Sequence, residues 1–320
     1  MKIAFFEITD LEKEKFSENL TNYELLFFED LIQNVNPSEY KNCDVICTFI
    51  YSKVSEDILK VCENLKAVLT RSTGTDHLNV KYCEDNNILV KNVPFYGENT
   101  VAEHTMALLL SISRKIEKSF LRIREGEFST VGLQGFDLKD KTIGLIGAGR
   151  IGLHFARMAR AFGMNVIVSD PRKDDFMADL IGFNYVTLDK LYKTSDIISL
   201  HAPYNESTHH MINEETINKM KDGIVIINTA RGGLIDTNSL LKALDSGKVS
   251  GAGLDVIEGE GELVEETIFN SPAPGAAKRI KQNQKLMANE NVVITPHNGF
   301  NSVEAVNRII NTTIENIKSV

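Results

Sequence analysis

The sequence predicts an α/β protein in which about two domains are built on parallel sheets. Short apolar runs alternate with amphipathic stretches along the chain, and a second series of the same kind begins near residue 141. Strands that alternate with helices pair in parallel, because each helix carries the chain back to the same edge of the sheet. The length of 320 residues suits two domains of about 100–200 residues each.

The first third of the chain holds the first series. Residues 55–64 follow a helical period, with Ile58, Leu59 and Cys62 on one face. Residues 100–114 are helical and apolar on every side, which predicts burial between domains or between subunits. The strands expected in this part are residues 2–6, 44–49, 66–70 and 88–91.

The second series predicts further strands and helices, with one irregular segment near its end. Residues 259–291 contain Pro272, Pro274 and a helical stretch at 276–288, and we interpret them as an insertion in the second domain. The strands expected here are residues 142–146, 165–169, 196–200, 224–228, 251–255 and 292–295. The helices expected are residues 151–162, 213–220, 237–246 and 302–318.

Composition and charge exclude several classes of protein. With 42% hydrophobic residues the chain can bury a core, and a net charge of −9 argues against a nucleic-acid binder or a protein of anionic membrane surfaces. No apolar run approaches the roughly 20 residues of a transmembrane helix. The apolar run at residues 1–6 ends at Glu7 and Asp10 without a small-residue cleavage site, so we interpret it as a strand rather than a signal peptide.

The four cysteines all lie in the first third of the chain. Cys43 and Cys47 form a CxxxC pair, but no histidine or second cysteine pair is spaced to complete a zinc site. A chain of this size needs no disulfides for its stability. We therefore expect these two and the remaining pair, Cys62 and Cys83, to be buried free thiols in a reducing cytoplasm.

A glycine-rich turn predicts a dinucleotide-binding site. Gly147, Gly149 and Gly152 form a GxGxxG pattern between a strand-like and a helix-like segment, where they permit a tight turn, the approach of a pyrophosphate and close helix–strand packing. Asp170 ends the next strand, 18 residues beyond Gly152, where a carboxylate accepts hydrogen bonds from ribose hydroxyls. We therefore expect NAD rather than NADP. An arginine at position 172 could accommodate a 2′-phosphate, but we interpret it as a solvated neighbour of the adenine.

Three polar residues follow strands of the second series, at the edge where parallel sheets place their ligands. They are Arg231, Glu260 and His297. An arginine offers a planar fork of donors to a carboxylate, and a histidine can donate a proton near neutral pH. Taken singly, each such residue is more often structural than functional.

With these motifs the sequence resembles the D-isomer-specific 2-hydroxyacid dehydrogenase family over almost its whole length. The resemblance implies a flavodoxin-like substrate domain of residues 1–99 plus 300–320 and a Rossmann NAD-binding domain of residues 100–299, each with a doubly wound parallel sheet. Besides the glycine-rich turn, the stretches that carry it are residues 196–203, 228–233, 253–256 and 295–297.

The resemblance also implies a catalytic set of arginine, glutamate and histidine. Arg231 would bind the carboxylate and the carbonyl oxygen of a 2-oxo acid, and His297 would donate the proton in reduction and take it back in oxidation. Glu260, 29 residues beyond Arg231, would orient the imidazole and favour its protonated form, although Glu258 or Glu262 could take that place. The gap of 37 residues from Glu260 to His297 is long for the family, and the irregular segment accounts for it.

Further contacts are carried over from the family by position. Thr73 and Gly74 would bind the substrate carboxylate through their N–H groups, while Tyr51 and Phe300 would line the pocket or serve only as core. The remaining cofactor contacts implied are Arg150, Ile151, Ala202, Pro203, Thr208, Thr229, Ala230 and Asp255. The histidines interpreted as structural or exposed are His77, His104, His201, His209 and His210.

The function that the resemblance implies is the NADH-dependent reduction of a small 2-oxo acid to a D-2-hydroxy acid, with pyruvate and D-lactate as the leading pair. A dehydrogenase of glycerate, 3-phosphoglycerate or a branched 2-hydroxy acid is the alternative. A non-enzymatic NAD-sensing corepressor is a more distant one, because the catalytic set is intact. The family is usually dimeric through its cofactor domains, which implies a homodimer to which residues 100–114 contribute, with no metal, nucleic acid or membrane involved.

Overall fold

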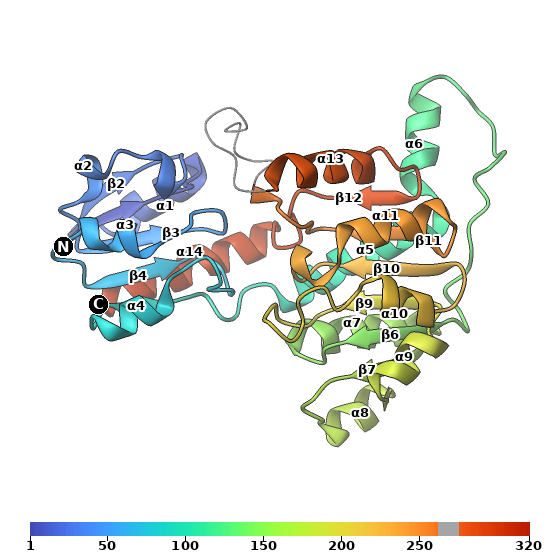
Figure 1. The fold of residues 1–320 in the computed structure, drawn as a ribbon. Coiled ribbons are helices and arrows are strands. Elements are labelled where there is room, and N and C mark those ends of the chain that lie inside the picture. The colour runs from blue at the N-terminus through green and yellow to red at the C-terminus, as the bar shows by residue number, and fades with distance from the viewer. Residues whose placement is uncertain (262–274) are drawn as a thin grey trace. The chain divides into compact units, whose positions relative to one another are not determined.

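A computed structural model describes residues 1–261 and 275–320 of the chain. The chain divides into two compact units, one formed by Met1–Gly97 with Asn301–Val320 and the other by Glu98–Phe300. Each unit is built on one parallel sheet (Figure 1), so the predicted α/β class with two doubly wound sheets is confirmed. The irregular segment contains the expected helix, α13 (Ala276–Met287), and its residues 262–274 lie outside the described part.

The first unit contains a five-stranded sheet in the order β2-β1-β3-β4-β5. Successive strand residues point to opposite faces, so Ala4 and Ile46 enter one apolar cluster while Ile3 and Val45 enter another. Both faces are therefore buried, as continuous apolar strands require. The strands are β1 (Lys2–Phe5), β2 (Glu24–Phe27), β3 (Val45–Thr48), β4 (Ala67–Thr70) and β5 (Leu89–Lys91). The helices are α1 (Asp10–Asn19), α2 (Pro37–Tyr40), α3 (Glu56–Val61), α4 (Val80–Asp85) and α14 (Val303–Lys318), with a 3₁₀ turn at Ile32–Asn34.

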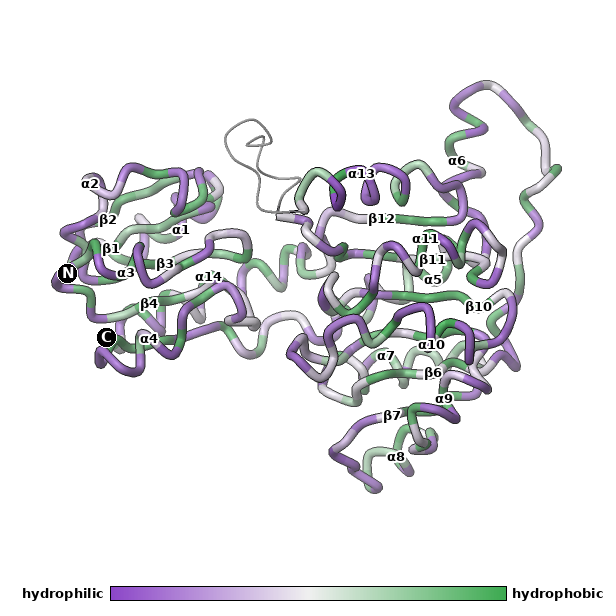
Figure 2. Tube along the Cα trace, in the orientation of Figure 1, coloured by the Kyte–Doolittle hydropathy of each residue, from purple (hydrophilic) through white to green (hydrophobic). Residues whose placement is uncertain are grey.

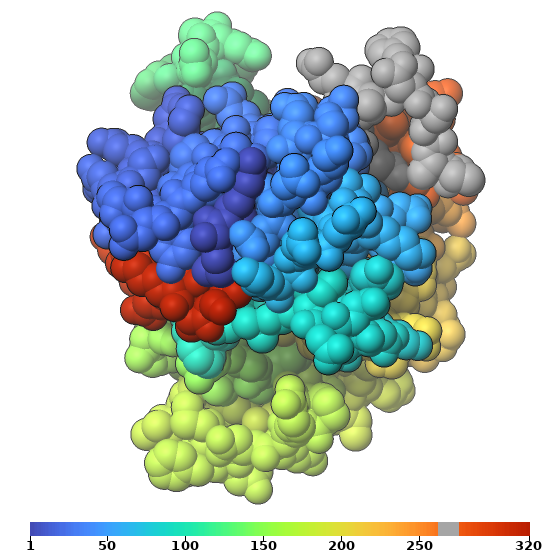
Figure 3. Space-filling view, turned by 90° about the vertical axis from the view of Figure 1, so that its left-hand side faces the viewer, coloured from blue at the N-terminus to red at the C-terminus, as the bar shows by residue number. Residues whose placement is uncertain are grey.

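The C-terminal helix α14 completes the first unit. Its buried Ile310, Ile314 and Ile317 belong to the same apolar cluster as Phe5 and Phe16 from the start of the chain. Figure 3 shows the residues of this helix in red directly beside the blue N-terminal segments. The end of the chain therefore supplies part of the core of the first sheet.

The described part of the second unit contains a seven-stranded sheet in the order β12-β11-β10-β9-β6-β7-β8. Ile224 and Ile226 of β10 enter one apolar cluster and Val225 and Ile227 enter a second, so this sheet too is covered on both faces. The strands are β6 (Thr142–Ile146), β7 (Asn165–Ser169), β8 (Asn184–Tyr185), β9 (Ile197–Leu200), β10 (Ile224–Asn228), β11 (Val249–Leu254) and β12 (Val292–Ile294). Besides α13, the helices are α5 (Glu98–Arg114), α6 (Ile116–Arg124), α7 (Arg150–Ala161), α8 (Asp175–Ile181), α9 (Leu188–Thr194), α10 (Glu214–Lys219) and α11 (Thr237–Asp245), with a 3₁₀ turn at Gly232–Leu234.

Hydropathy along the chain follows these layers. Figure 2 shows the central strands β6 and β10 mainly in green, whereas the helices alternate between green and purple along their length. Such helices bury one face and leave the other in water. Among the helices that the structure describes, none is long and apolar enough to cross a membrane.

Helix α5 is the long apolar helix expected at residues 100–114. It packs against α7 and β11 of its own unit. Glycines of β11 allow this close approach, because a Cβ on Gly251 would lie 2.8 Å from Ile112 Cγ2 and one on Gly253 would lie 3.1 Å from Leu108 Cβ. Packing inside the second unit therefore accounts for the burial of this helix, and its expected contribution to a dimer stays a prediction.

The cysteines are free and buried, as expected from the sequence. Burial raises the pKa of the Cys43 thiol to about 12, and it raises the pKa values of Cys47 and Cys62 to about 11. The pKa of Cys83 is raised by the same cause. All four side chains therefore act as small apolar groups of the first unit.

We expect the native protein to react with iodoacetamide far more slowly than the chain unfolded in concentrated urea. The reactive species is the thiolate, and burial both disfavours it and blocks access. Mass spectrometry of the intact protein during labelling measures the rate under each condition. Rapid labelling of even one cysteine in the native protein would contradict the burial described here.

Candidate active site

The glycine-rich turn joins β6 to α7 and is tightly packed against its neighbours. Gly147 has a φ of +100°, and a Cβ there would lie 2.6 Å from the carbonyl oxygen of His201. A Cβ on Gly152 would lie 2.4 Å from the carbonyl oxygen of Gly147. Gly149, the N-cap of α7, has no atom within 4 Å of its Cβ position. The turn thus leaves room for an anionic group at the start of α7, where unpaired N–H groups favour one.

Asp170, directly after β7, lies against the same turn. One carboxylate oxygen accepts the N–H of Ala148 at 2.7 Å, and the other accepts the N–H of Arg172 at 2.7 Å. A carboxylate has further lone pairs, so both oxygens can still accept hydroxyl groups of a ribose. The other predicted contacts at this turn, Arg150 and Ile151, are the first two residues of α7. The residues present therefore fit the pyrophosphate and ribose of a dinucleotide.

Replacing Asp170 with alanine is expected to weaken NADH binding by about ten- to a hundredfold, because charge-assisted hydrogen bonds to the ribose are lost. The affinity for NADPH should fall less, since the carboxylate no longer repels a 2′-phosphate. Fluorescence titration with each cofactor measures both effects. Asp174→Ala is the matched control, because this carboxylate caps α8 rather than the glycine-rich turn. An equal loss for both cofactors would contradict the assignment.

The segment after β9 holds three of the predicted cofactor contacts, Ala202, Pro203 and Thr208, together with His201. The distance between His201 Nε2 and the Ser199 hydroxyl oxygen is 2.9 Å. Burial lowers the pKa of His201 to about 3, so its ring is neutral. Ala202 is buried, whereas Pro203 is exposed. The Thr208 hydroxyl donates to the Pro203 carbonyl at 2.7 Å. This segment is therefore fixed from within before any ligand is considered.

The segment after β10 carries Thr229, Ala230 and Arg231. The Asn228 side chain spans it, accepting the Ala230 N–H at 3.0 Å and donating to the Arg231 carbonyl at 2.9 Å. The Thr229 hydroxyl lies 2.8 Å from that of Thr105 on α5. Asn228 therefore holds the turn in the shape that places Arg231 at the carboxyl edge of the sheet.

The structure pairs Glu260, and not Glu258, with His297. The distance between Glu260 Oε1 and His297 Nδ1 is 2.7 Å, and the two side chains are 26% and 18% exposed. Glu258 pairs instead with His210. Glu262, the third carboxylate considered, lies outside the described residues. A carboxylate on Nδ1 leaves Nε2 as the nitrogen that can exchange a proton with a ligand.

His297 occupies a strained turn that Asp255 holds in place. Its φ is +50°, a left-handed conformation that costs a residue other than glycine of order 1–3 kcal/mol. The His297 N–H donates to the Asp255 carbonyl at 2.8 Å, while the Asp255 carboxylate accepts the N–H groups of Asn298 at 2.7 Å and Gly299 at 2.8 Å. The sequence resemblance gave Asp255 a contact with the nicotinamide, which stays a prediction. In the structure this buried carboxylate clamps the turn that carries His297.

His104 of α5 joins this clamp, although the sequence analysis treated it only as structural or exposed. Its Nε2 lies 2.9 Å from Thr295 Oγ1 and 3.2 Å from Asp255 Oδ1. Burial alone would raise the pKa of Asp255, but hydrogen bonds from His104 and Thr295 outweigh it and lower that pKa. The one available signal was a single imidazole in an otherwise apolar helical run.

The predicted substrate contacts of the first unit lie after β3 and β4. The Tyr51 N–H donates at 2.9 Å to the carboxylate of Glu7, which follows β1. The Thr73 hydroxyl donates to the Val93 carbonyl at 2.9 Å, and the Ser72 hydroxyl donates to the Gly74 carbonyl at 2.7 Å. Phe300, the remaining predicted contact, belongs to the second unit and is half-buried.

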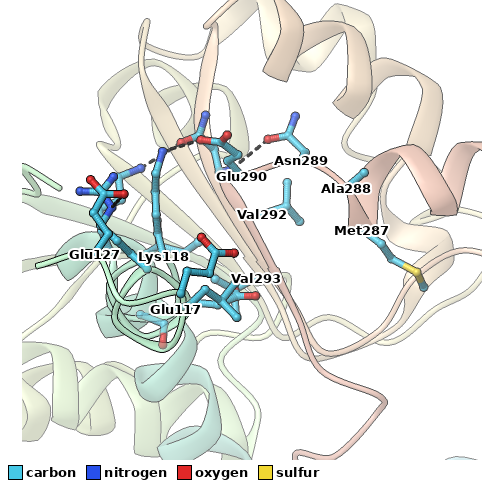
Figure 4. A pocket seen from close by; sticks show the side chains of 16 residues that line it. Glu117, Lys118, Glu127, Met287, Ala288, Asn289, Glu290, Val292 and Val293 are labelled. Atoms are coloured by element: carbon cyan, nitrogen blue, oxygen red, sulfur yellow. Dashed lines mark hydrogen bonds and ion pairs between the residues drawn. The ribbon is translucent and has the colours of Figure 1, made fainter. Parts of the chain in front are cut away.

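A cavity of about 400 Å³ in the second unit is lined by residues of α5, of α6 and of the segment that joins α13 to β12. Figure 4 shows Lys118 beside Glu290 at its wall, and the two form an ion pair. Lys115 donates to the Asn291 side chain at 2.9 Å. Arg122 and Glu127 form a second ion pair at this cavity, and none of the predicted site residues lines it.

A match to a known protein family shows where this chain belongs. A family model described as "D-isomer specific 2-hydroxyacid dehydrogenase, NAD binding domain" matches residues 106–299. The chain belongs to this family. It is therefore an NAD-dependent oxidoreductase, and the predictions of family, enzyme class and cofactor are confirmed.

Relatives of this dehydrogenase cover nearly its whole length. It is 37% identical over 324 residues to "2-hydroxyacid dehydrogenase homolog 1" of Schizosaccharomyces pombe, covering 99% of this chain and 95% of that protein. It is 41% identical over 274 residues to the hydroxypyruvate reductase of Thermotoga maritima, covering 86% and 83%. Its fold matches the crystal structure of D-lactate dehydrogenase from Aquifex aeolicus complexed with NAD and lactic acid, with a TM-score of 0.91, 36% identity and coverage of 99% and 94%.

Proposed function

We propose that this dehydrogenase reduces a small 2-oxo acid with NADH to the D-2-hydroxy acid, and that pyruvate and D-lactate are its physiological pair. The observation that carries the proposal is the Glu260–His297 pair, held on a clamped turn beside the carboxyl edge of an NAD-binding sheet. The similarity to the Aquifex D-lactate dehydrogenase supports the choice of substrate.

His297 acts as the acid in reduction and as the base in oxidation. Bound NADH supplies the hydride that reaches C2 of the substrate. His297 delivers the proton to the oxygen on which negative charge develops, and Glu260 orients the ring and favours its protonated form. Arg231 binds the substrate carboxylate and polarises the carbonyl through its fork of N–H donors.

We assign the residues of the first unit to substrate binding. The N–H groups of Thr73 and Gly74 bind the carboxylate, because successive backbone N–H groups in a turn can hold an anion. Tyr51 and, from the second unit, Phe300 bound the space for the substrate side chain. The size of that side chain, and hence the choice of 2-oxo acid, depends on these two aromatic residues.

Hydroxypyruvate is the second candidate substrate. The support is the 41% identity to the Thermotoga hydroxypyruvate reductase, the highest identity among the three relatives described above. Hydroxypyruvate differs from pyruvate by one hydroxyl group, so the same acid, base and carboxylate contacts serve both. A pocket that hydrogen-bonds the extra hydroxyl group would discriminate strongly in its favour.

The test is NADH oxidation by the purified protein with pyruvate, hydroxypyruvate and a branched 2-oxo acid at equal concentration, followed by chiral analysis of the product. The highest kcat/KM for pyruvate and a D-product support the proposal. A higher value for another acid keeps the mechanism and changes the substrate. Tight NADH binding without turnover of any of them would refute the proposal.

We also propose that the protein is a cytoplasmic homodimer. Helix α6 and the residues after it expose apolar side chains, which a second copy of the chain would cover. The free thiols fit a reducing compartment. Light scattering of the wild type and of Phe120→Asp tests the dimer, with a monomeric mass expected only for the variant. The exposed side chains concerned are Ile116, Phe120, Leu121, Ile123, Phe128 and Val131.

A further inference from the structure

Two carboxylate–imidazole pairs meet on one short turn of the second unit. Glu260 pairs with His297 at 2.7 Å, and Glu258, two residues earlier, pairs with His210 at 2.9 Å between Oε1 and Nε2. The proposed chemistry uses only the first pair. The second pair is 25% exposed at the glutamate and 29% at the histidine, so water screens it only in part.

Glu258 is held from three separate elements. Its Oε1 binds His210 of the segment after β9, and its Oε2 accepts the hydroxyl of Thr237, the first residue of α11, at 3.0 Å. Its carbonyl accepts the side-chain N–H of Asn283, a buried residue of α13, at 2.9 Å. A surface glutamate has no need of such a set of partners, so the position of this residue is closely determined.

The turn that Glu258 anchors also carries Glu260. Inside it the Glu260 N–H donates to the Ile257 carbonyl, and the Ile257 N–H donates to the Glu260 carboxylate, both at 3.3 Å. Gly232, next to Arg231, packs directly on it, because a Cβ there would lie 2.1 Å from the Ile257 carbonyl and 2.5 Å from the Glu258 nitrogen. A shift of Glu258 therefore moves Glu260 and disturbs the backbone beside Arg231.

The backbone of His210 is prepared for this contact. Its φ is +48°, and its two peptide groups are fixed by a 2.9 Å bond from its N–H to the Gly233 carbonyl and another from the Asn213 side chain to its own carbonyl. The backbone of His210 is therefore strained and firmly held. This indicates that its side chain must point in one particular direction. The charged and titratable groups that face the ring are Glu258, Asp236 at 3.9 Å and the stacked ring of His209.

We propose that His210 and Glu258 are positioning residues, which fix the turn at residues 257–260 so that the Glu260 carboxylate meets Nδ1 of His297. The proposal rests on the proposed function of the Glu260–His297 pair. Neither residue is required to touch the substrate. Their contribution to the reaction is the orientation of the acid, so removing either should affect the same step.

The test compares His210→Asn, Glu258→Gln and the double variant. Asparagine tolerates the left-handed backbone but is too short to replace the imidazole, and glutamine keeps the shape of the glutamate without its charge. We expect each single variant to lower kcat about tenfold, with NADH affinity within about twofold of the wild type, and the double variant to lose little more than a single one. The alkaline limit of reduction should move to lower pH, because a displaced Glu260 no longer favours the protonated ring.

Glu214→Gln is the matched control, because it makes the same change in an exposed glutamate whose ion pair, with Lys242 at 3.0 Å, involves neither His210 nor Glu258. It should leave kcat and the pH profile as they are. Unchanged kcat and pH profile in His210→Asn and Glu258→Gln, or losses that simply multiply in the double variant, would overturn the proposal.

A readout without turnover separates this proposal from the proposed function. The ¹⁵N NMR signals of the His297 ring report its hydrogen bond to Glu260, and they should change in Glu258→Gln but not in Glu214→Gln. If the wild type reduces no 2-oxo acid, the proposed function fails while this comparison still tests the positioning. If the signals stay the same in Glu258→Gln, the positioning fails whatever the substrate is.

Discussion

Replacing His297 with asparagine is expected to lower kcat for 2-oxo acid reduction by about 100- to 10,000-fold, because the carbonyl oxygen loses its proton donor. Asparagine is chosen since it tolerates the φ of +50° found at this position, so the turn need not rearrange. Binding of NADH should remain, because the glycine-rich turn and Asp170 lie at other strand ends. Steady-state kinetics and a fluorescence titration with NADH measure the two quantities.

Glu260→Gln provides the comparison for His297→Asn. The amide still reaches Nδ1, but it no longer favours the protonated ring, so we expect a smaller loss and an alkaline limit of reduction at lower pH. Equal losses in both variants would mean that orientation outweighs proton donation. Retention of most of the wild-type kcat in His297→Asn would remove this residue from the mechanism.

The strands that the sequence predicted best are those buried on both faces. β6 and β10 were expected at residues 142–146 and 224–228 and occur there. Each is a continuous apolar run between turn residues, which is the pattern of a strand buried on both faces. β2 and β8 were not predicted. No residue of β2 is fully buried and β8 has two residues, so both are edge strands with little pattern of their own.

The sequence also carries a local signal for α1, a helix that apolar periodicity does not predict. In α1 only Phe16 is buried, so its apolar pattern is weak. Thr9 and Glu12 nevertheless form a capping box at its start, with the Glu12 carboxylate 3.0 Å from the Thr9 N–H. The cap, rather than apolar periodicity, is therefore the sequence signal that predicts this helix.

In the candidate site, too, some residues could be predicted from local sequence, whereas others depend on tertiary packing. Arg231, Glu260 and His297 could be proposed because each follows a strand within a recognisable stretch of sequence. The partners that orient them could not, since His104 and His210 reach Asp255 and Glu258 only through the fold. Sequence spacing thus indicates which side chains react, while the supporting hydrogen bonds depend on packing between distant elements.

Arg71 is the second residue with a large expected effect, and it lies in the first unit. Its side chain is fully buried, and its Nε forms an ion pair with Glu12 at 3.0 Å. Its Nη2 donates to the carbonyl groups of Phe6 at 3.0 Å and Glu7 at 2.6 Å, and the guanidinium lies over the ring of Phe49. One arginine therefore ties the ends of β1, β3 and β4 to the start of α1.

The same arginine supports the predicted substrate contacts indirectly. The Glu7 carboxylate, whose backbone Arg71 holds, accepts the N–H groups of Phe49, Tyr51 and Ser52 at 2.9–3.1 Å. Arg71 itself directly precedes the segment that contains Thr73 and Gly74 in the chain. Both loops proposed to bind the substrate thus depend on one buried charge.

Replacing Arg71 with methionine is expected to destabilise the first unit by about 3–5 kcal/mol, because Glu12 and two carbonyl groups lose their donor inside the protein. Methionine has a similar length, so the loss reflects the charge and its hydrogen bonds rather than a large cavity. Hydrogen exchange of the β1 and β4 amides measures the opening free energy of this unit without assuming that the whole chain unfolds in one step. The KM for the 2-oxo acid should rise while NADH affinity is retained.

Lys60→Met is the matched control for this variant. Lys60 also pairs with a glutamate, Glu56, at 2.6 Å, but both side chains are at least half exposed, and an exposed ion pair contributes little. The exchange rates of this control should stay close to those of the wild type. If Arg71→Met were as stable as Lys60→Met, the buried guanidinium would not hold the unit together, and the two loops would need another support. If stability fell but the KM did not change, the arginine would maintain the fold without organising the substrate contacts.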